Sequence, residues 1–485
     1  VLDNPDTYIG SIENVSSNVF IYNQNNQKIV EKNISYIPGL YKLFDEGIVN
    51  CRDHVIRMNQ LISQTNKTNK SSKTNKTSQT NKSNKTSQTS QIFPVTKIDV
   101  SISDDTISLY NDGNGIDVSM HPEYNIWIPE LIFGHLRTST NYDKSEKKIV
   151  GGKNGFGFKL VLIWSTWGQI ETVDSKTGQK YIQTFKNNLD IIEPPIITKS
   201  QSKPYTIVKF KPDFKRLGID GLSDDFKSLI LRRIYDIAAV TNKSVNVTFN
   251  SNKLKPEIKN FQNYIDLYIG SKTDTERVYE EANERWEYAV CLAPNDEFSQ
   301  VSFVNGIFTS KGGKHVDYIM NQIIKKLTIY IKEKKHIDVK PASIKEQLMI
   351  FVNSTIENPA FDSQTKDYLN SAVSNFGSTC EVSSKFIEKI AKMGIMNIAC
   401  SLTELKENKA QKKTDGNKCK NIRNIPKLVD ANFAGTNKSK ECILILCEGD
   451  SAKSGIISGL SREDRNNIGV YPMKGKIFNV RGESQ

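Results

Sequence analysis

Apolar side chains recur every three to four positions in three stretches of the chain, a spacing that predicts amphipathic helices. The first stretch runs from Tyr36 to about Leu61, and the others cover residues 222–240 and Val316–Lys335. Residues 98–110 alternate between apolar and polar around an Asp-Asp turn, which predicts a β-hairpin. Shorter apolar runs of β type occur in WGQIETVD, KYIQTF, YTIVKF, SVNVTFN, SQVSFVNGIF and CILIL.

This mixture of helices and strands predicts α/β and α+β architecture in more than one domain. A length of 485 residues corresponds to about two to four domains. No uncharged apolar run reaches about 18 residues, so we expect no membrane-spanning helix and no membrane partner. The chain opens without an initiating Met or a basic-then-apolar leader and stops at Gly-Glu-Ser-Gln. We therefore expect a piece of a longer protein that is not secreted.

Ser63–Gln91 is a low-complexity insert of Ser, Thr, Asn, Gln and Lys with nothing to bury. We expect it to be a solvated, disordered loop between a helix and a strand. Its six lysines supply half of the formal net charge of +12, so the charge is compatible with a nucleic-acid partner without identifying one. The seven cysteines form no C-x-x-C pair, which favours a reducing, intracellular compartment.

Glu46, Asn50 and Asp53 form the first pattern that could carry chemistry. Their spacing of four and three positions places them on one face of the first predicted helix. The Glu46 carboxylate could orient a water molecule or accept its proton, and the Asn50 amide oxygen could ligate a Mg²⁺ that also holds phosphates. The alternative is the solvated face of an amphipathic helix.

The second pattern, Asn111-Asp112-Gly113-Asn114-Gly115, follows a predicted strand. Such a turn puts a carboxylate beside exposed backbone amides, where it can accept a hydrogen bond from an adenine amino group. The alternative is an ordinary glycine turn.

A glycine-rich stretch, Gly151-Gly-Lys-Asn-Gly-Phe-Gly-Phe-Lys159, leads into an apolar helical pattern. Free backbone N–H groups at the start of a helix favour a bound triphosphate. The spacing matches neither a Walker A loop, which ends in Gly-Lys-Ser/Thr, nor the dinucleotide fingerprint. The glycines alone are therefore weak support for a nucleotide site.

In this order and separation, the three patterns resemble the GHKL (Bergerat-fold) ATPases, which hold a nucleotide on an α/β sandwich under a mobile lid. Longer matches resemble the eukaryotic-type (type IIA) DNA topoisomerases in particular. These matches are Pro5–Ser11, Ile132–Asp143, Gln300–Gly306, Lys311–Tyr318, Glu357–Lys366, Cys447–Lys453 and Pro472–Arg481. The resemblance covers essentially the whole chain apart from the insert.

The resemblance implies a role for each matching residue. Glu46 would position or activate the water that attacks the γ-phosphate of ATP, and Asn50 would ligate Mg²⁺. Asp112 would read the adenine, although the family carries Asn at this place. Lys366, with Gln364 and Thr365 beside it, would reach the γ-phosphate from a second domain, so that hydrolysis changes how the two domains sit. The residues expected to contact the ribose and the phosphates are Ser139, Thr140, Asn141, Gly152, Lys153, Asn154, Gly155, Phe156, Gly157, Phe158 and Lys159.

The resemblance also implies an incomplete TOPRIM domain at the end of the chain. Glu448 would help hold a metal at a DNA-cleavage centre, and Lys476 and Asn479 match positions that contact DNA. The family motif around the DNA-attacking tyrosine does not occur in the sequence. We therefore expect this piece to hydrolyse ATP without cutting DNA.

A lysine cluster near residue 333 falls where the family carries a loop that reaches DNA. Glu333 interrupts the cluster, so the alternative is a solvated helix end. The three lysines are Lys332, Lys334 and Lys335.

The predicted segments follow one another along the chain. They are a GHKL ATPase domain over 1–250 with the disordered insert at 63–91, a transducer α/β domain over 251–400, a basic linker over 401–440 and the start of the TOPRIM domain over 441–485.

The function that the resemblance implies is ATP-dependent passage of one DNA duplex through another by a homodimer with an ATP-operated gate. Double-stranded DNA would be the substrate, in the nucleus or, for a viral protein, at a viral replication site. Two alternatives are a non-cutting GHKL clamp of the MutL or chaperone kind and a type IIB topoisomerase. The Lys- and Asn-rich composition is typical of a protist or a large DNA virus.

Overall fold

The computed structural model describes residues 1–74, 91–103, 105–135, 149–150, 157–401, 427–461 and 463–473. The chain divides into two compact units, each drawn from segments far apart in the sequence. The first unit comprises Val1–Ala289, Gln300–Ile319 and Ile350–Val382. The second unit comprises Val290–Ser299, Met320–Met349 and Ser383–Gln485.

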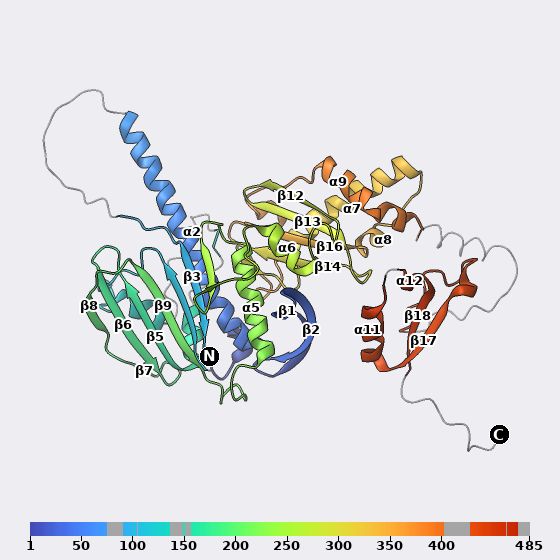
Figure 1. Cartoon of the computed structure of the whole chain (residues 1–485). Coiled ribbons are helices and arrows are strands. Elements are labelled where there is room, and N and C mark those ends of the chain that lie inside the picture. Colours follow the sequence, from blue (N-terminus) through green and yellow to red (C-terminus); the bar gives the residue numbers. More distant parts are fainter. Residues whose placement is uncertain are drawn as a thin grey trace, which may run out of the picture. The chain divides into compact units, whose positions relative to one another are not determined.

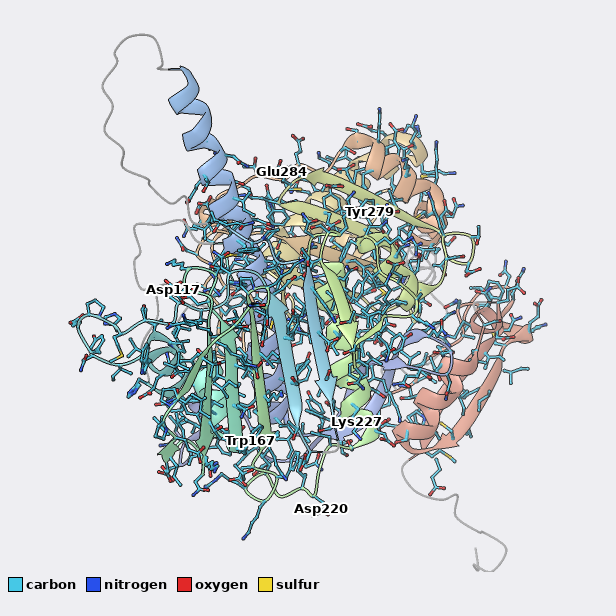
Figure 2. The ribbon with its side chains drawn as sticks, turned by 60° about the vertical axis from the view of Figure 1, so that its left-hand side comes forward. Asp117, Trp167, Asp220, Lys227, Tyr279 and Glu284 are labelled. Carbon is cyan, nitrogen blue, oxygen red and sulfur yellow. The ribbon has the colours of Figure 1, made fainter. Side chains whose placement is uncertain are left out.

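A nine-stranded sheet is the largest element of the first unit (Figure 1). Its order is β11-β10-β3-β4-β9-β5-β6-β7, and β8 pairs with β6. The predicted hairpin is confirmed, because β3 and β4 pair antiparallel with Asp99 opposite Tyr110. Asp117 lies at one end of the sheet and Trp167 at the other (Figure 2). The strands are β3 (Lys97–Ile102), β4 (Ile107–Asp112), β5 (Ser165–Val173), β6 (Gln179–Lys186), β7 (Ile191–Ile192), β8 (Ile196–Lys199), β9 (Tyr205–Pro212), β10 (Asn246–Phe249) and β11 (Asn252–Lys253).

Helix α2 (Pro38–Thr74) packs on β3 and β4 and contacts α4 (Gly157–Ile163) and α5 (Asp224–Ala239). The helices predicted near residues 36–61 and 222–240 are confirmed. Leu40, Leu43 and Phe44 are fully buried, as their helical spacing requires. Ser223 caps the start of α5: its hydroxyl accepts a hydrogen bond from the Phe226 N–H and so satisfies a donor at the helix start.

The prediction of a disordered loop over Ser63–Gln91 is wrong for its first part, because α2 continues to Thr74. The sequence contains neither glycine nor proline between Gly47 and Pro94, so no residue of this part interrupts the helix. The hydroxyls of Ser63 and Thr65 donate to main-chain carbonyls one turn earlier and are satisfied within the helix. Residues 75–90 lie outside the described part of the chain.

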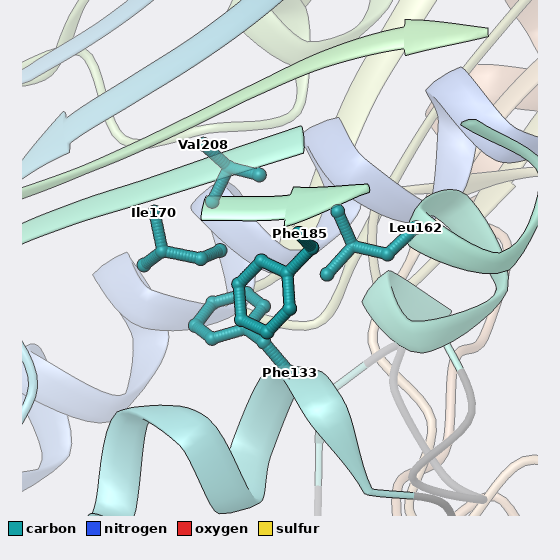
Figure 3. Packing of buried hydrophobic residues seen from close by; sticks show 5 residues of the cluster. All are labelled: Phe133, Leu162, Ile170, Phe185 and Val208. Carbon is teal, nitrogen blue, oxygen red and sulfur yellow. The ribbon is translucent and has the colours of Figure 1, made fainter. Parts of the chain in front are cut away.

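The large sheet and its helices enclose a hydrophobic core. Phe133 of helix α3 (Ile128–Gly134) and Leu162 of α4 meet Ile170, Phe185 and Val208 from three strands (Figure 3). All five side chains are buried, and Phe158 also packs against this core. The start of α4 is thereby fixed over the sheet, beside α2.

The N-terminal residues form a separate hairpin in the first unit. The short helix α1 (Pro5–Tyr8) precedes β1 (Val15–Asn23) and β2 (Lys28–Tyr36), which pair antiparallel. Ile21 and Ile34 from this hairpin pack on Leu229 of α5.

A second sheet has the strand order β12-β13-β16-β14-β15. The long helix predicted over Val316–Lys335 is confirmed as α7, which begins at Lys314. The strands are β12 (Arg277–Asn283), β13 (Trp286–Leu292), β14 (Ser299–Val304), β15 (Ile307–Phe308) and β16 (Leu348–Ser354), and the helices are α6 (Phe261–Ile269), α7 (Lys314–Lys335) and α8 (Pro341–Lys345).

The C-terminal part of the second unit contains a two-stranded parallel sheet. The predicted strand CILIL is confirmed as part of β17 (Ile443–Glu448), which pairs with β18 (Ile468–Met473). The helices of this part are α9 (Ser384–Ile390), α11 (Gly449–Gly459) and α12 (Asp464–Asn467). Among the described residues of the whole chain, no helix has the length and apolarity needed to cross a bilayer.

Candidate functional site

Helix α2 carries the acidic and amide residues singled out by their spacing. Their face of the helix is not solvated, since Glu46 is 6% exposed and Asp53 is 3% exposed. The side-chain amide of Asn50 donates to the main-chain oxygen of Glu46 at 2.6 Å. The alternative of an ordinary solvated helix face is therefore wrong for Glu46 and Asp53.

Lys366 reaches Glu46 from a position 320 residues away in the sequence. Its Nζ lies 2.8 Å from Glu46 Oε1, and both side chains are about nine-tenths buried. This ion pair lies wholly within the first unit. The structure thus brings together the two residues to which the resemblance assigns the central roles.

The segment that carries Lys366 is held on both sides by main-chain hydrogen bonds. The Leu369 N–H donates to the Gly312 carbonyl, and the Lys311 N–H donates to the Asp367 carbonyl. The Lys366 N–H donates to the Ser363 carbonyl, and Lys366 itself has a φ of 62°, a left-handed turn conformation. These constraints fix the backbone from which the Lys366 side chain extends.

The same segment is tied to the turn between β14 and β15. The side chain of Asn305 accepts from the Ile356 N–H at 2.8 Å and donates to the Ile356 carbonyl at 2.9 Å. Two buried arginines hold this turn from the other side: Arg52 of α2 donates to the Asn305 carbonyl, and Arg233 of α5 donates to the Gly306 carbonyl. The backbone that leads to Lys366 is therefore anchored to α2 and α5.

Buried cations surround the Glu46 carboxylate. Lys42 Nζ lies 3.1 Å from Glu46 Oε1 and 3.1 Å from Asp45 Oδ2, and Arg233 Nε lies 2.7 Å from Asp45 Oδ1. Burial alone would raise the pKa of Glu46, but Lys366 and Lys42 outweigh burial and hold that pKa below its ordinary value. Glu46 is therefore ionised at neutral pH.

The start of α4 lies against the same carboxylate. A Cβ atom placed on Gly157 would stand 3.0 Å from Glu46 Oε2 and 3.2 Å from Asn50 Nδ2. Only a residue without a side chain lets the α4 backbone approach Glu46 and Asn50 this closely. Lys159, also on α4, is 3% exposed, and burial lowers the pKa of its ammonium to about 8.

Asp112 does not face the site, which contradicts its predicted role in reading adenine. Both of its carboxylate oxygens accept hydrogen bonds from Thr96 and Lys97 on the neighbouring segment. A Cβ on Gly47 of α2 would touch Leu109, so Leu109 of β4 points toward α2. Successive strand residues point to opposite faces, and the α2 face is therefore shared by Asn111, not Asp112. Asn111 is 8% exposed, and the alternation in β4 could have identified it.

Several predicted nucleotide contacts lie outside the described residues, and two others sit beside Lys366. The Thr365 hydroxyl donates to Asp367 Oδ2 at 2.8 Å, and Gln364 lies next to it in the same loop. Those outside the described part of the chain are Ser139, Thr140, Asn141, Gly152, Lys153, Asn154, Gly155 and Phe156.

The residues predicted to bind DNA or a second metal belong to the second unit. Lys332 pairs with Asp338 at 2.9 Å on the surface, and Lys334 and Lys335 are exposed at the end of α7. Glu448 ends β17 and is exposed. Lys476 and Asn479 lie outside the described part of the chain. Within that part, no three His, Cys, Asp or Glu side chains cluster as metal ligands.

Residues 258–418 match the family model described as DNA gyrase B. The DNA topoisomerase 2 of Saccharomyces cerevisiae is 41% identical over 503 residues, covering 100% of this chain and 33% of that protein. The DNA topoisomerase 2 of Acanthamoeba polyphaga mimivirus is 42% identical over 492 residues, covering 100% of this chain and 36% of that protein. The chain thus spans about a third of the length of these curated relatives.

Solved structures match the fold. The crystal structure of the ATPase region of Saccharomyces cerevisiae topoisomerase II has a TM-score of 0.72 and 41% identity, covering 83% of this chain and 96% of that chain. The ATPase and transducer domains of DNA topoisomerase II from Balamuthia mandrillaris give a TM-score of 0.73 and 35% identity, covering 84% and 96%.

Proposed function

The chain belongs to the type II DNA topoisomerase family, matching its ATPase region, and from that premise we propose that this chain binds ATP and hydrolyses it between α2 and the Lys366 loop. The observation that carries the proposal is the buried contact of 2.8 Å between Lys366 Nζ and Glu46 Oε1. This contact places Glu46, an anionic group that can orient water, next to Lys366, a cation that can bind a phosphate.

Glu46 orients the attacking water and accepts its proton as the bond to the γ-phosphate breaks. Because its pKa is held low, Glu46 enters the reaction as a carboxylate, and its main contribution is to position the water. Lys366 turns from Glu46 toward the γ-phosphate, where a charge-assisted hydrogen bond contributes about 1.5–3 kcal/mol. Asn111, and not Asp112, accepts a hydrogen bond from the adenine amino group through its amide oxygen.

The residues beside Glu46 fit a magnesium ion bound mainly through phosphates. Asn50 offers one neutral oxygen, and the described residues contain no cluster of acids that would hold Mg²⁺ without a nucleotide. The main chain at Gly157 lies against both Glu46 and Asn50. When bound, Mg²⁺ neutralises charge on the phosphates and holds them in one orientation.

The activity, partners and location expected from the resemblance belong to the same proposal. The longer protein that contains this chain passes double-stranded DNA through a double-strand break, acts as a homodimer whose N-terminal gate closes with ATP, and works in the nucleus or at a viral replication site. The segment boundaries at about residues 250, 400 and 440 remain predictions. Glu448, at the end of β17, supports a cleavage domain in cis over a non-cutting clamp.

We expect this chain to release phosphate from ATP in the presence of Mg²⁺. We also expect a non-hydrolysable ATP analogue, but not ADP, to shift it from monomer to dimer in analytical ultracentrifugation. No phosphate release by a folded sample would contradict the proposed ATPase. Strand passage is tested with the full-length protein, since a protein that closes with ATP but never relaxes supercoiled plasmid would be a clamp.

Replacing Gly157 with alanine will slow ATP turnover by about three- to tenfold, because the new methyl group displaces Glu46 or Asn50 by a few tenths of an ångström. Steady-state phosphate release measures the effect. Gly221→Ala is the matched control, since a Cβ there meets no atom within 4 Å. Equal turnover in the two variants would show that Gly157 does not lie close to the reacting atoms.

A further inference from the structure

Lys42 is a buried cation that the sequence patterns did not single out. It lies on α2 one turn before Glu46 and is 5% exposed. Its Nζ bridges Asp45 Oδ2 and Glu46 Oε1, each at 3.1 Å. Burying an ammonium group costs several kcal/mol unless close anions compensate. The carboxylates of Asp45 and Glu46 provide that compensation for Lys42.

Lys42 and Lys366 contact the same oxygen of Glu46. Both ammonium groups approach Oε1, whereas Oε2 lies toward Gly157 of α4. Lys42 is fixed to the helix that carries Glu46, three and four positions from its partners. Lys366 belongs to a loop from the second sheet. Lys366 can therefore leave Glu46 while α2 stays intact, whereas Lys42 cannot.

The ion pairs continue from Lys42 into α5. Asp45 pairs with Arg233, and Asp236 pairs with Arg232 and lies 3.6 Å from Arg233. Together with Glu46, Lys42 and Lys366, these groups make a buried chain of alternating charges. If Lys366 leaves it, three cations and three anions remain, and Glu46 keeps one cationic partner, which is Lys42.

We propose that Lys42 is the positioning residue that holds Glu46 in its catalytic orientation after Lys366 has turned to the γ-phosphate. This inference rests on the proposed ATPase function. In this role Lys42 acts through Oε1 of Glu46 and leaves Oε2 directed toward Gly157. The other charged groups near Glu46 are Asp45 on its own helix and Lys366, and Lys159 lies on the neighbouring α4.

The test compares Lys42→Met with Lys42→Arg in the full chain. Lys42→Met keeps an unbranched apolar side chain and removes the ammonium group, so a displaced Glu46 should lower turnover at saturating ATP on the order of 10- to 100-fold. The affinity for ADP, measured by titration calorimetry, should stay within about threefold of the parent. Lys42→Arg restores a cation at the same place and should recover most of the turnover.

Lys32→Met is the matched control, because Lys32 also pairs with an aspartate but does so on the surface, away from Glu46. Turnover by Lys42→Met within about twofold of the parent would overturn the proposal. An equal loss of turnover and ADP affinity would do the same, and so would a Lys42→Arg protein as slow as Lys42→Met. If thermal unfolding shows that Lys42→Met is not folded, Lys42→Gln is judged by the same criteria.

A Glu46→Ala variant separates this proposal from the function on which it rests. If Glu46→Ala turns over ATP like the parent, the assignment of Glu46 fails, and the role of Lys42 fails with it. If Glu46→Ala is inactive while Lys42→Met is fully active, only the role of Lys42 is overturned.

Discussion

Replacing Glu46 with alanine will lower ATP turnover by about 10²- to 10⁴-fold, the range typical for loss of a group that handles a proton in the transition state. Nucleotide affinity should change little, because Glu46 acts on the water and not on the nucleotide. Phosphate release at saturating ATP measures the first effect, and a titration with ADP measures the second.

The matched control for this substitution is Glu171→Ala. Glu171 also pairs with a lysine, Lys180, at 2.8 Å, but it lies on β5 and not on α2. The control should keep turnover close to that of the parent. A Glu46→Ala protein that hydrolyses ATP at the parental rate would remove Glu46 from the mechanism.

Replacing Lys366 with methionine will weaken ATP binding and hydrolysis far more than ADP binding. The lost contact to the γ-phosphate corresponds to about 1.5–3 kcal/mol, or about 10- to 150-fold in affinity. The affinity for ADP should stay unchanged, because ADP lacks the γ-phosphate. Titration of the variant with ADP and with a non-hydrolysable ATP analogue gives the two affinities.

Lys311→Met is the control for Lys366, since Lys311 lies beside the same loop. Its side chain is 70% exposed, and its Nζ makes only a long contact of 3.8 Å with Asp367 Oδ2. It should leave both affinities unchanged. Thermal unfolding establishes that the Lys366 variant is folded, because Glu46 loses one of its two buried cations. Equal losses for ADP and the ATP analogue would exclude a specific contact with the γ-phosphate.

Local spacing was sufficient to predict the elements that build the site. The helical period identified α2 and placed Glu46 and Asn50 on one face, and alternation identified the β3–β4 hairpin. The same helical spacing places Lys42, four positions before Glu46, on that face of α2. It was missed because a lysine on a helix is ordinarily solvated, and only burial shows that this one is not.

Contacts between distant parts of the chain could not be derived from spacing. The pairing of Lys366 with Glu46 spans 320 positions and was not predicted; the resemblance to a known family placed Lys366 only at the γ-phosphate. The prediction for Asp112 considered the glycine turn without the alternation of the strand before it, and the structure places the Asp112 carboxylate against Thr96 and Lys97. The polar composition of the insert led us to expect disorder. A helix can nevertheless continue into such a stretch when no glycine or proline interrupts it, as α2 does up to Thr74.

The central claim is that one ammonium group, Lys366 Nζ, pairs with Glu46 in the free chain and with the terminal phosphate when ATP is bound. The most direct measurement is a crystal structure of the chain with a non-hydrolysable ATP analogue and Mg²⁺. We predict Lys366 Nζ at hydrogen-bond distance, about 2.7–3.2 Å, from a γ-phosphate oxygen, with Glu46 beside the line of water attack. A nucleotide bound with Lys366 still paired only to Glu46, or directed away from the phosphates, would contradict the account.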